Sequence, residues 1–387
     1  MLRFEHVSLS YGSQQILDDL SFEIQEGQMA VLIGPSGCGK TTTLKMINRL
    51  IEPTAGRIYL DGQDITTKDK VELRRHIGYV IQQIGLFPNM TVAQNISVVP
   101  TLLKYSREEC DRIVRELLDM VNLPYEQYAH KYPSEMSGGQ QQRIGILRAL
   151  AASPPIVLMD EPFSALDPMT RAELQDEIHT LQKKTKKTVV FVTHDMDEAI
   201  KLADRICIIQ EGHIVQCDTP ERILKAPANQ YVTDFIGANR LWANPEYIRA
   251  RDIMRRRPIT ISRGRTVLQA LQIMRQSGVD SLLVVDGRDR LLGVLWLEEL
   301  MSEKDGSGSA ETYLSDDYVA VEGDTTLKEI ISTIDYDVSG IIPVIEHDRT
   351  LVGFLTKSSL LATMSRQFVP EHTAGERSGV IWAAAAH

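Results

Sequence analysis

The segment MAVLIGPSGCGKTTTLKMINRLI, residues 29–51, joins a continuous apolar run to a glycine-rich loop and then to a helical pattern. The loop matches the pattern G-x-x-x-x-G-K-[ST], with Gly39, Lys40 and Thr41 at its defining end. Its glycines let backbone N–H groups converge on phosphate, while the lysine reaches the β- and γ-phosphates and the threonine hydroxyl ligates Mg²⁺. The segment therefore predicts a nucleotide-binding α/β domain.

Three further apolar runs follow this segment within the first 230 residues. They are Gly78–Gln82, Pro155–Asp160 and Thr188–Thr193, each short and nearly free of polar residues. Runs of this kind are typical of buried parallel strands, and helical patterns lie between them. A hairpin with Gly212 in its turn is expected over RICIIQEGHIVQ.

Polar side chains follow two of these runs. IVLMDEP ends in two adjacent carboxylates, and we expect Asp160 to hold the Mg²⁺ shell while Glu161 turns toward the attacking water as general base. Pro162 helps to end the strand. FVTHD places His194 at another strand end, where an imidazole can contact the γ-phosphate. A solvated acidic turn and a structural histidine are the plainer interpretations of these two motifs.

A second glycine-containing helix start follows about a hundred positions later. SGGQQQRIGILRALAA, residues 137–152, begins with small residues and continues as a good helix. Exposed N–H groups at a helix start suit anions, so this stretch resembles a second phosphate site. A single ATP site needs only one phosphate-binding helix start, so the second one requires an explanation.

The ordered set SYG, GPSGCGKT, IQQ, SGGQQQR, VLMDEP, SALD and THD resembles the ATPase subunit of an ABC transporter over residues 1 to about 230. The resemblance implies a P-loop NTPase fold with a helical subdomain at residues 83–135 that grips a membrane permease. It also implies two ATPase subunits arranged head to tail, each ATP lying between one P-loop and the partner's signature helix. The second helix start then serves the other subunit's nucleotide. Met136 stands where the family usually has Leu, a change of little consequence.

The same resemblance assigns the remaining site residues. Tyr11 would stack on adenine, Gln82 would touch Mg²⁺ or the water, and Ser164–Asp167 would form the loop that crosses the dimer. Glu161, His194 and Gln82 form the catalytic set, and Thr41, Gln82 and Asp160 the metal set. The expected ATP contacts are Tyr11, Gly34, Pro35, Ser36, Gly37, Cys38, Gly39, Lys40, Thr41, Thr42, Ser137, Gly138, Gly139, Gln140 and Asp167.

Composition narrows the class of protein. The 387 residues carry a formal net charge of −10, which argues against a general nucleic-acid binder. No apolar run approaches the roughly 18–20 residues that span a bilayer, so we expect a cytoplasmic protein that meets the membrane through a partner. The four cysteines form no Cys-x-x-Cys pair, which indicates neither a zinc site nor a disulfide framework.

Residues 251–365 contain an internal repeat with an offset of 60 positions. TVLQAL at 266–271 matches TLKEII at 326–331, and both begin as capping boxes. Each half is expected to run strand, helix, strand, strand, helix, and the pair to cover each other's apolar faces. The repeat resembles a tandem CBS pair, an α/β module that often binds adenine nucleotides. Glu299 and Ser359 replace the aspartates that hold ribose in that family, which argues against ordinary AMP or ATP binding.

An ABC ATPase fused to a CBS pair resembles the subunits that energise uptake of glycine betaine, choline, carnitine or related osmoprotectants. The permease and an extracellular substrate-binding protein would contact the solute, and this chain would lie on the cytoplasmic face of the membrane. The alternatives are import of another small solute, a soluble ABC ATPase of repair or translation, and a CBS scaffold with a degraded ATPase.

The C-terminal pair is expected to regulate the ATPase. Five arginines lie close together before the first repeat, at Arg249, Arg251, Arg255, Arg256 and Arg257. They form either a solvated face or a patch for an anionic ligand or lipid, and the two inputs that we expect are a cyclic adenine dinucleotide or ionic strength. The expected divisions are 1–230 for the ATPase, 231–250 for a linker, 251–310 and 311–365 for the CBS repeats, and 366–387 for a tail of unknown role.

Overall fold

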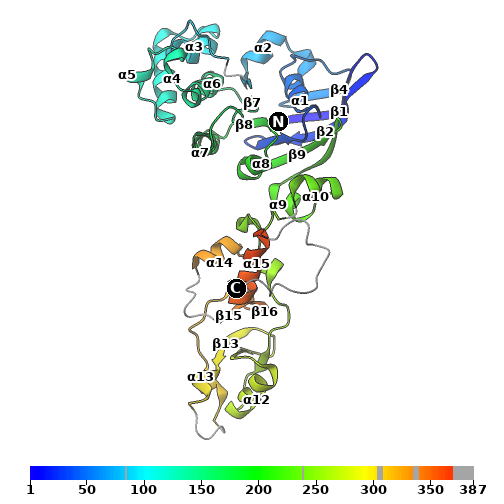
Figure 1. The fold of residues 1–387 in the computed structure, drawn as a ribbon, viewed down its shortest axis with the longest axis vertical. Helices are drawn as coiled ribbons and strands as arrows, with labels where there is room; N and C mark the ends of the chain where they lie inside the picture. The colour runs from blue at the N-terminus through cyan, green and yellow to red at the C-terminus, as the bar shows by residue number, and fades with distance from the viewer. Residues whose placement is uncertain (83–84, 238, 303–307, 334–339, 369–387) are drawn as a thin grey trace, which may run out of the picture. The chain divides into compact units, whose positions relative to one another are not determined.

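The computed structural model describes residues 1–82, 85–237, 239–302, 308–333 and 340–368 of the chain (Figure 1). The chain divides into two compact units, Met1–Phe235 and a second that begins at Ile236. The division falls within a short helix, α10 (Gln230–Ile236), close to the boundary expected after residue 230.

A six-stranded sheet forms the centre of the first unit, in the order β10-β9-β3-β8-β7-β6. Five of these strands are parallel to one another and only β10, at the edge, is antiparallel to β9, which confirms the four expected parallel strands. These strands are almost wholly buried because helices cover such sheets on both faces. The bounds are β3 (Met29–Ile33), β6 (Ile77–Val80), β7 (Ile156–Asp160), β8 (Thr188–Thr193), β9 (Arg205–Gln210) and β10 (His213–Asp218).

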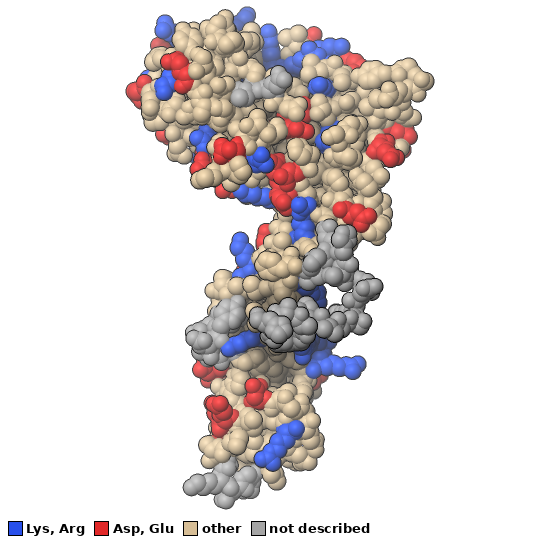
Figure 2. Space-filling view, in the orientation of Figure 1, with Lys and Arg blue, Asp and Glu red and all other residues tan. Residues whose placement is uncertain are grey.

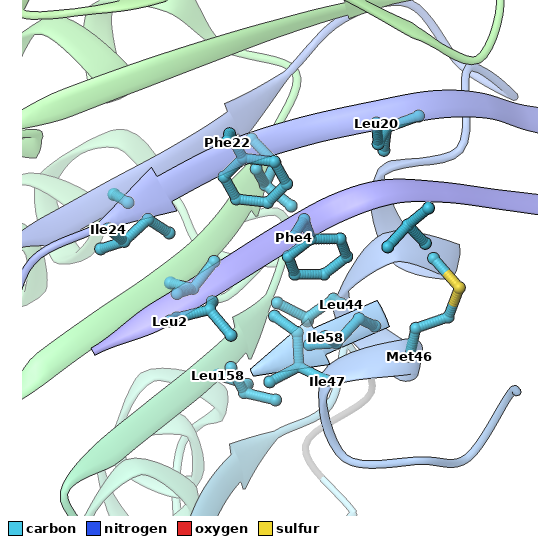
Figure 3. Close-up of a cluster of buried hydrophobic side chains, with 14 of the residues drawn as sticks. Leu2, Phe4, Leu20, Phe22, Ile24, Leu44, Met46, Ile47, Ile58 and Leu158 are labelled. Carbon is cyan, nitrogen blue, oxygen red and sulfur yellow. The ribbon is translucent and has the colours of Figure 1, made fainter. Parts of the chain in front are cut away.

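A four-stranded antiparallel sheet packs over helix α1 (Lys40–Ile47). Figure 3 shows Leu44 and Ile47 of this helix beside Phe4 and Ile58 from the antiparallel sheet and Leu158 from β7, all in one buried cluster. The helix that follows the glycine-rich loop is therefore clamped between the two sheets. The antiparallel strands are β2 (Gln14–Ile24), β1 (Leu2–Tyr11), β4 (Ala55–Leu60) and β5 (Gln63–Asp64).

Helices α3 to α6 form a separate layer with its own apolar core (Figure 1). Its buried residues include Ile96 on α3, Leu118 on α4 and Leu147 on α6. Three of these helices occupy the region expected to be a helical subdomain. The bounds are α3 (Val92–Leu102), α4 (Arg107–Met120), α5 (Tyr125–Tyr128) and α6 (Gly138–Leu150).

The remaining helices of the first unit flank the strands or connect them. Both α7 and α8 follow strands of the six-stranded sheet, β7 and β8, and so begin at its carboxyl edge. The bounds are η1 (Ile65–Thr67), α2 (Lys70–Arg75), η2 (Pro133–Glu135), α7 (Pro168–Thr185), α8 (Met196–Leu202) and α9 (Pro220–Lys225).

One cysteine expectation is corrected at the β9–β10 hairpin. Gly212 lies in the turn as expected, but a register shift between Ile214 and Gln216 moves every later residue of β10 by one position. Cys217 therefore lies opposite Cys207, and the two form a disulfide. The spacing of the cysteines alone gives no sign of this bulge.

The second unit confirms the expected repeat of strand, helix, strand, strand, helix. Its two three-stranded sheets have the orders β11-β12-β13 and β14-β15-β16. Both expected capping boxes form, from Thr266 to Gln269 and from Thr326 to Glu329. The first half comprises β11 (Thr260–Ser262), α12 (Val267–Ser277), β12 (Ser281–Val285), β13 (Leu291–Trp296) and α13 (Leu297–Leu300). The second comprises β14 (Val321–Glu322), α14 (Leu327–Thr333), β15 (Ile341–Ile345), β16 (Leu351–Thr356) and α15 (Lys357–Ser365), and the short helices are η3 (Pro245–Tyr247), α11 (Ala250–Ile253), η4 (Ala310–Tyr313) and η5 (Arg366–Phe368).

The segment that precedes each half packs against the other half. Ile248 and Ala250 lie in the core of the second half, whereas Ala310 lies in the core of the first. Backbone bridges repeat this exchange, since Arg255 pairs with Phe354 just as Ser315 pairs with Val294. Each half therefore contributes a segment to the other, and this exchange holds the expected pair together.

Charge is mixed over the face of the first unit that Figure 2 shows. Lys and Arg side chains lie among Asp and Glu side chains there, with no extended area of one sign. This mixed face is in keeping with the ordinary balance of charged residues in the chain.

Candidate active site

The glycine-rich loop closes tightly around its own lysine. Lys40 Nζ donates to the carbonyl oxygens of Gly34 at 2.7 Å and Pro35 at 2.9 Å, and only 6% of the residue is exposed. Gly39 has φ +104°, and a Cβ there would lie 2.3 Å from Leu17 Cδ2. A side chain at this position would both strain the backbone and displace a core leucine, so the loop requires glycine there.

The other residues of the loop differ in exposure. Pro35, Ser36 and Gly37 are exposed, whereas Thr42 is half-buried. Cys38 is buried with its Sγ 3.9 Å from Lys40 Nζ, and burial raises the pKa of its thiol. These positions suit a loop whose N–H groups face outward and whose thiol fills space inside.

Thr41 and Asp160 meet at the base of the loop. The Thr41 hydroxyl donates to Asp160 Oδ1 at 2.8 Å, and Asp160 is 5% exposed. Burial raises the pKa of the Asp160 carboxyl, although the Thr41 hydrogen bond and the charges of Lys45 and Lys40 act in the opposite direction. Two oxygen donors at this distance, one a desolvated carboxylate, are ligands that Mg²⁺ prefers.

Glu161, just beyond β7, contacts side chains that follow the two neighbouring strands β6 and β8. Gln82 Nε2, just beyond β6, donates to Glu161 Oε2 at 3.1 Å, and His194 Nδ1, just beyond β8, lies 3.7 Å from the same oxygen. Glu161 adopts φ +44° and its N–H donates to Val192 O at 3.1 Å. The left-handed backbone at Glu161 thus marks the turn by which the chain leaves β7.

The second helix start is separate from the first. Ser137 caps α6, with its Oγ 3.3 Å from Gln140 N and its own N–H 3.0 Å from Gln140 Oε1. Figure 1 shows α6 in the layer of α3–α5 and α1 apart from it, and the two helices contribute to different apolar cores. A Cβ on Gly139 would lie 2.5 Å from Thr170 Cγ2, whereas a Cβ on Gly138 would meet open space. The hydrogen bonds of Ser137 described here thus stay within the first turn of α6.

Two further expected site residues lie on other elements, at the end of β1 and before α7. Tyr11 ends β1 and is 57% exposed, as a residue that stacks on a base must be before it binds. Asp167 caps α7, with Oδ1 accepting from the N–H groups of Met169 at 3.2 Å and Thr170 at 3.1 Å. A hydrogen bond from the Thr170 side chain, together with the N–H groups of Thr170 and Met169, lowers the pKa of the Asp167 carboxyl.

Sequence reasoning missed the side chains that support the strand ends. Thr193 and Glu198, next to His194, are both buried and hydrogen-bonded to each other. Arg143, on α6, pairs with Glu177 on α7 at 2.9 Å. A carboxylate in the first turn of a helix is normally an exposed capping residue, so the sequence gives no sign that Glu198 is buried.

Comparison with known proteins gives two family matches. Residues 17–164 match the ABC transporter family, and residues 250–303 and 310–366 match the CBS domain. The chain is 51% identical over 368 residues to the glycine betaine/carnitine/choline transport ATP-binding protein OpuCA of Bacillus subtilis, covering 93% of this chain and 95% of that protein. It is 50% identical over 364 residues to the choline transport ATP-binding protein OpuBA of the same organism, with the same two coverages.

Among solved structures, the chain resembles a dimeric ATP-binding cassette in a post-hydrolysis state, bound to ADP and Pi. The two are 35% identical with a TM-score of 0.51, over 57% of this chain and 99% of that one. The match therefore concerns the first unit, where the expected P-loop NTPase fold is confirmed.

Proposed function

We propose that a quaternary-amine osmoprotectant is the cargo served by this chain, which belongs to the ABC transporter ATP-binding proteins that carry a CBS pair. It is an ATP hydrolase coupled to transport. Glycine betaine, carnitine and choline appear in the names of the relatives that are about half identical over nearly the whole chain, and these names support the cargo. The observation that carries the catalytic part is the convergence of Lys40, Thr41, Asp160 and Glu161 at one sheet edge.

Nucleotide binding begins at the glycine-rich loop. Lys40 would exchange its bonds to Gly34 O and Pro35 O for the β- and γ-phosphates, and the exposed residues Ser36 and Gly37 would supply backbone N–H groups. Thr42, at the start of α1, adds to this cradle. Tyr11 is free to stack on adenine because its ring is exposed.

Mg²⁺ fits the donor set at the base of the loop. Thr41 and Asp160 would hold it, with Gln82 beside them, because all three offer neutral or anionic oxygen. When bound, Mg²⁺ neutralises charge on the phosphate oxygens. Asp160 contributes a carboxylate that burial has already stripped of water.

Hydrolysis needs a proton acceptor beside the γ-phosphate. Glu161 is suited to this role because its Oε2 already accepts from Gln82 and lies near His194 Nδ1, so both groups orient it. We assign the attacking water's proton to Glu161. His194 would contact the γ-phosphate, since its side chain is 65% exposed.

A second copy of the chain completes each site. We propose a head-to-tail dimer in which Ser137, Gly138, Gly139 and Gln140 of one copy bind the ATP held by the other copy's glycine-rich loop. The separation of α6 from α1 supports this arrangement, because the two helices belong to different apolar cores. Asp167 and its loop would lie at the crossing point between the copies.

Membrane contact would go through permease subunits held by the helical layer α3–α5. No helix in the described ranges is long and apolar enough to span a bilayer. Because the named relatives are ATP-binding proteins of transport systems, we propose a peripheral position on the cytoplasmic face, with an extracellular substrate-binding protein acting through the permease. The cargo would never touch this chain.

For the CBS pair we propose regulation by a cyclic adenine dinucleotide or by ionic strength. Arg255, Arg256 and Arg257 are exposed, whereas Arg251 Nη2 lies 2.6 Å from Asp324 Oδ2. The exposed three support contact with phosphates or with anionic lipid. Salt would screen the latter with a Debye length of about 8 Å near 0.15 M.

Uptake measurements test the proposed function. Cells that depend on this transporter should accumulate labelled glycine betaine, choline or carnitine at high osmolarity with the wild-type chain, and fail to do so with Glu161→Gln. Unlabelled quaternary amines should compete, whereas neutral amino acids and sugars should not. Uptake that persists with Glu161→Gln, or competition by an unrelated solute instead, would contradict the proposal.

A further inference from the structure

The Thr193 hydroxyl makes two hydrogen bonds that fix the turn carrying His194. Thr193 Oγ1 accepts from Asp195 N at 3.0 Å and donates to Glu198 Oε2 at 2.6 Å. His194 lies between Thr193 and Asp195 in the chain, so the bond from Asp195 back to Thr193 closes a tight loop around it. The position of the imidazole therefore depends on where the Thr193 hydroxyl is held.

Glu198 holds that hydroxyl from inside the protein. The residue is 7% exposed and Thr193 is 2% exposed, so water does not compete well for their hydrogen bond. Glu198 Oε1 accepts a second, longer bond of 3.4 Å from Gln175 Nε2 on α7. Both carboxylate oxygens thus have a donor, and a side chain with one acceptor oxygen cannot serve both.

Helix α7 connects this pair to the loop expected at the dimer crossing. Gln175 is itself held by Lys201 Nζ at 3.3 Å, and Arg171 on the same helix donates from Nη2 to Leu166 O at 3.0 Å. Leu166 belongs to the loop that precedes α7. Burial raises the pKa of the Glu198 carboxyl, while the Thr193 hydrogen bond and the charge of Arg171 act in the opposite direction. The carboxylate consequently joins the His194 turn to the base of the Ser164–Asp167 loop.

We infer that Glu198 is a positioning residue for ATP hydrolysis, which fixes His194 through Thr193 and ties that turn to α7 through Gln175. The inference rests on the proposed role of His194 at the γ-phosphate. Glu198 itself touches no reacting atom and acts only through these two neighbours.

A double-mutant cycle on the full chain tests this. Glu198→Ala should lower kcat for ATP about tenfold, the size expected for one hydrogen bond to a charged group, with KM changed less than about twofold. In a His194→Ala background the same change should lower kcat less than about twofold, because the group it positions is gone. Lys184→Ala, at an exposed position of α7 outside this network, is the control and should leave kcat unchanged.

Conservative variants keep the test decisive if Glu198→Ala fails to fold. Thr193→Val removes the hydroxyl at similar volume and should reproduce the kcat loss, whereas Thr193→Ser should restore the wild-type rate. Glu198→Gln, which retains one acceptor oxygen, should fall between Glu198→Ala and the wild type.

Two outcomes would overturn the inference and are distinguishable. Equal kcat losses for Glu198→Ala with and without His194 would show that Glu198 acts elsewhere, and would leave the proposed function intact. A His194→Ala chain that hydrolyses ATP at the wild-type rate would instead remove His194 from the proposed function, and the inference with it.

Discussion

The hydroxyl of Thr41 donates to the carboxylate of Asp160 at 2.8 Å, across 119 positions of sequence. The contact forms because the loop after β3 and the end of β7 meet at the same edge of the parallel sheet. Its acceptor is a buried carboxylate whose pKa is raised by desolvation. This pair is therefore placed to bind a cation. Without the cation, the buried carboxylate lowers the stability of the folded protein.

Asp160→Asn should raise the melting temperature of the nucleotide-free protein at pH 7 by about 2 °C or more. A carboxyl whose folded pKa is raised adds stability below its unfolded pKa, and that stability is lost as the pH rises through the folded pKa. The gain should therefore shrink as the pH falls toward the ordinary pKa range of an aspartate carboxyl. Thermal melts across this range check the sign, and a melting temperature lowered by the change at pH 7 would contradict it. Mg²⁺-dependent ATP binding should be lost.

Glu161→Gln should lower turnover about 10²–10⁴-fold, the usual contribution of a general base. The amide cannot take the proton, while Lys40 still holds phosphate, so ATP binding should remain. With hydrolysis blocked, the ATP-bound chain should elute as a dimer in size-exclusion chromatography. Hydrolysis at the wild-type rate would remove Glu161 from this role.

Gly39→Ala should abolish ATP binding and destabilise the first unit by about 1–2 kcal/mol, because φ +104° is costly for any residue with a Cβ. The new methyl group must also displace Leu17. Gly138→Ala, whose Cβ would meet open space, is the stability control and should leave the melting temperature unchanged. Similar melts for the two variants would show that the loop tolerates a side chain.

Ile248→Ala should destabilise the second unit by about 2–5 kcal/mol, the usual cost of truncating a buried isoleucine. Ile248 is 1% exposed and lies in the core of the second CBS half, although it precedes the first half in sequence. Leu268→Ala, at a 65% exposed position, is the control. Denaturant unfolding of the full chain measures both, and equal stabilities would contradict the exchange of segments.

Much of the first unit could be predicted because parallel strands are continuous apolar runs and their carboxyl ends share an edge. That rule alone brings Asp160, Glu161 and His194 near the glycine-rich loop. It does not predict which groups touch. The bond from Gln82 to Glu161 depends on the left-handed turn at Glu161, and the disulfide depends on a bulge in β10.

The second unit shows the same limit. A repeat of 60 positions indicates two similar halves, but it does not tell which half receives the segment that precedes each one. Ile248 and Ala310 pack against the partner half through tertiary contacts that leave no periodic signal. The sequence also gives no sign that Glu198 is buried, because its neighbours along the chain are those of an ordinary helix start.

The central claim is that the two phosphate-binding helix starts serve two different ATP molecules. Ser137→Arg and Lys40→Ala chains should each lack ATPase activity alone, and Ser137→Arg should still bind ATP. Mixed in equal amounts, they should recover about a quarter of the wild-type rate, because half of the randomly paired dimers contain one intact site. A chain with both changes, mixed with either single variant, should recover nothing. A mixture as inactive as its parts, or a Ser137→Arg monomer that cannot bind ATP, would contradict the head-to-tail account.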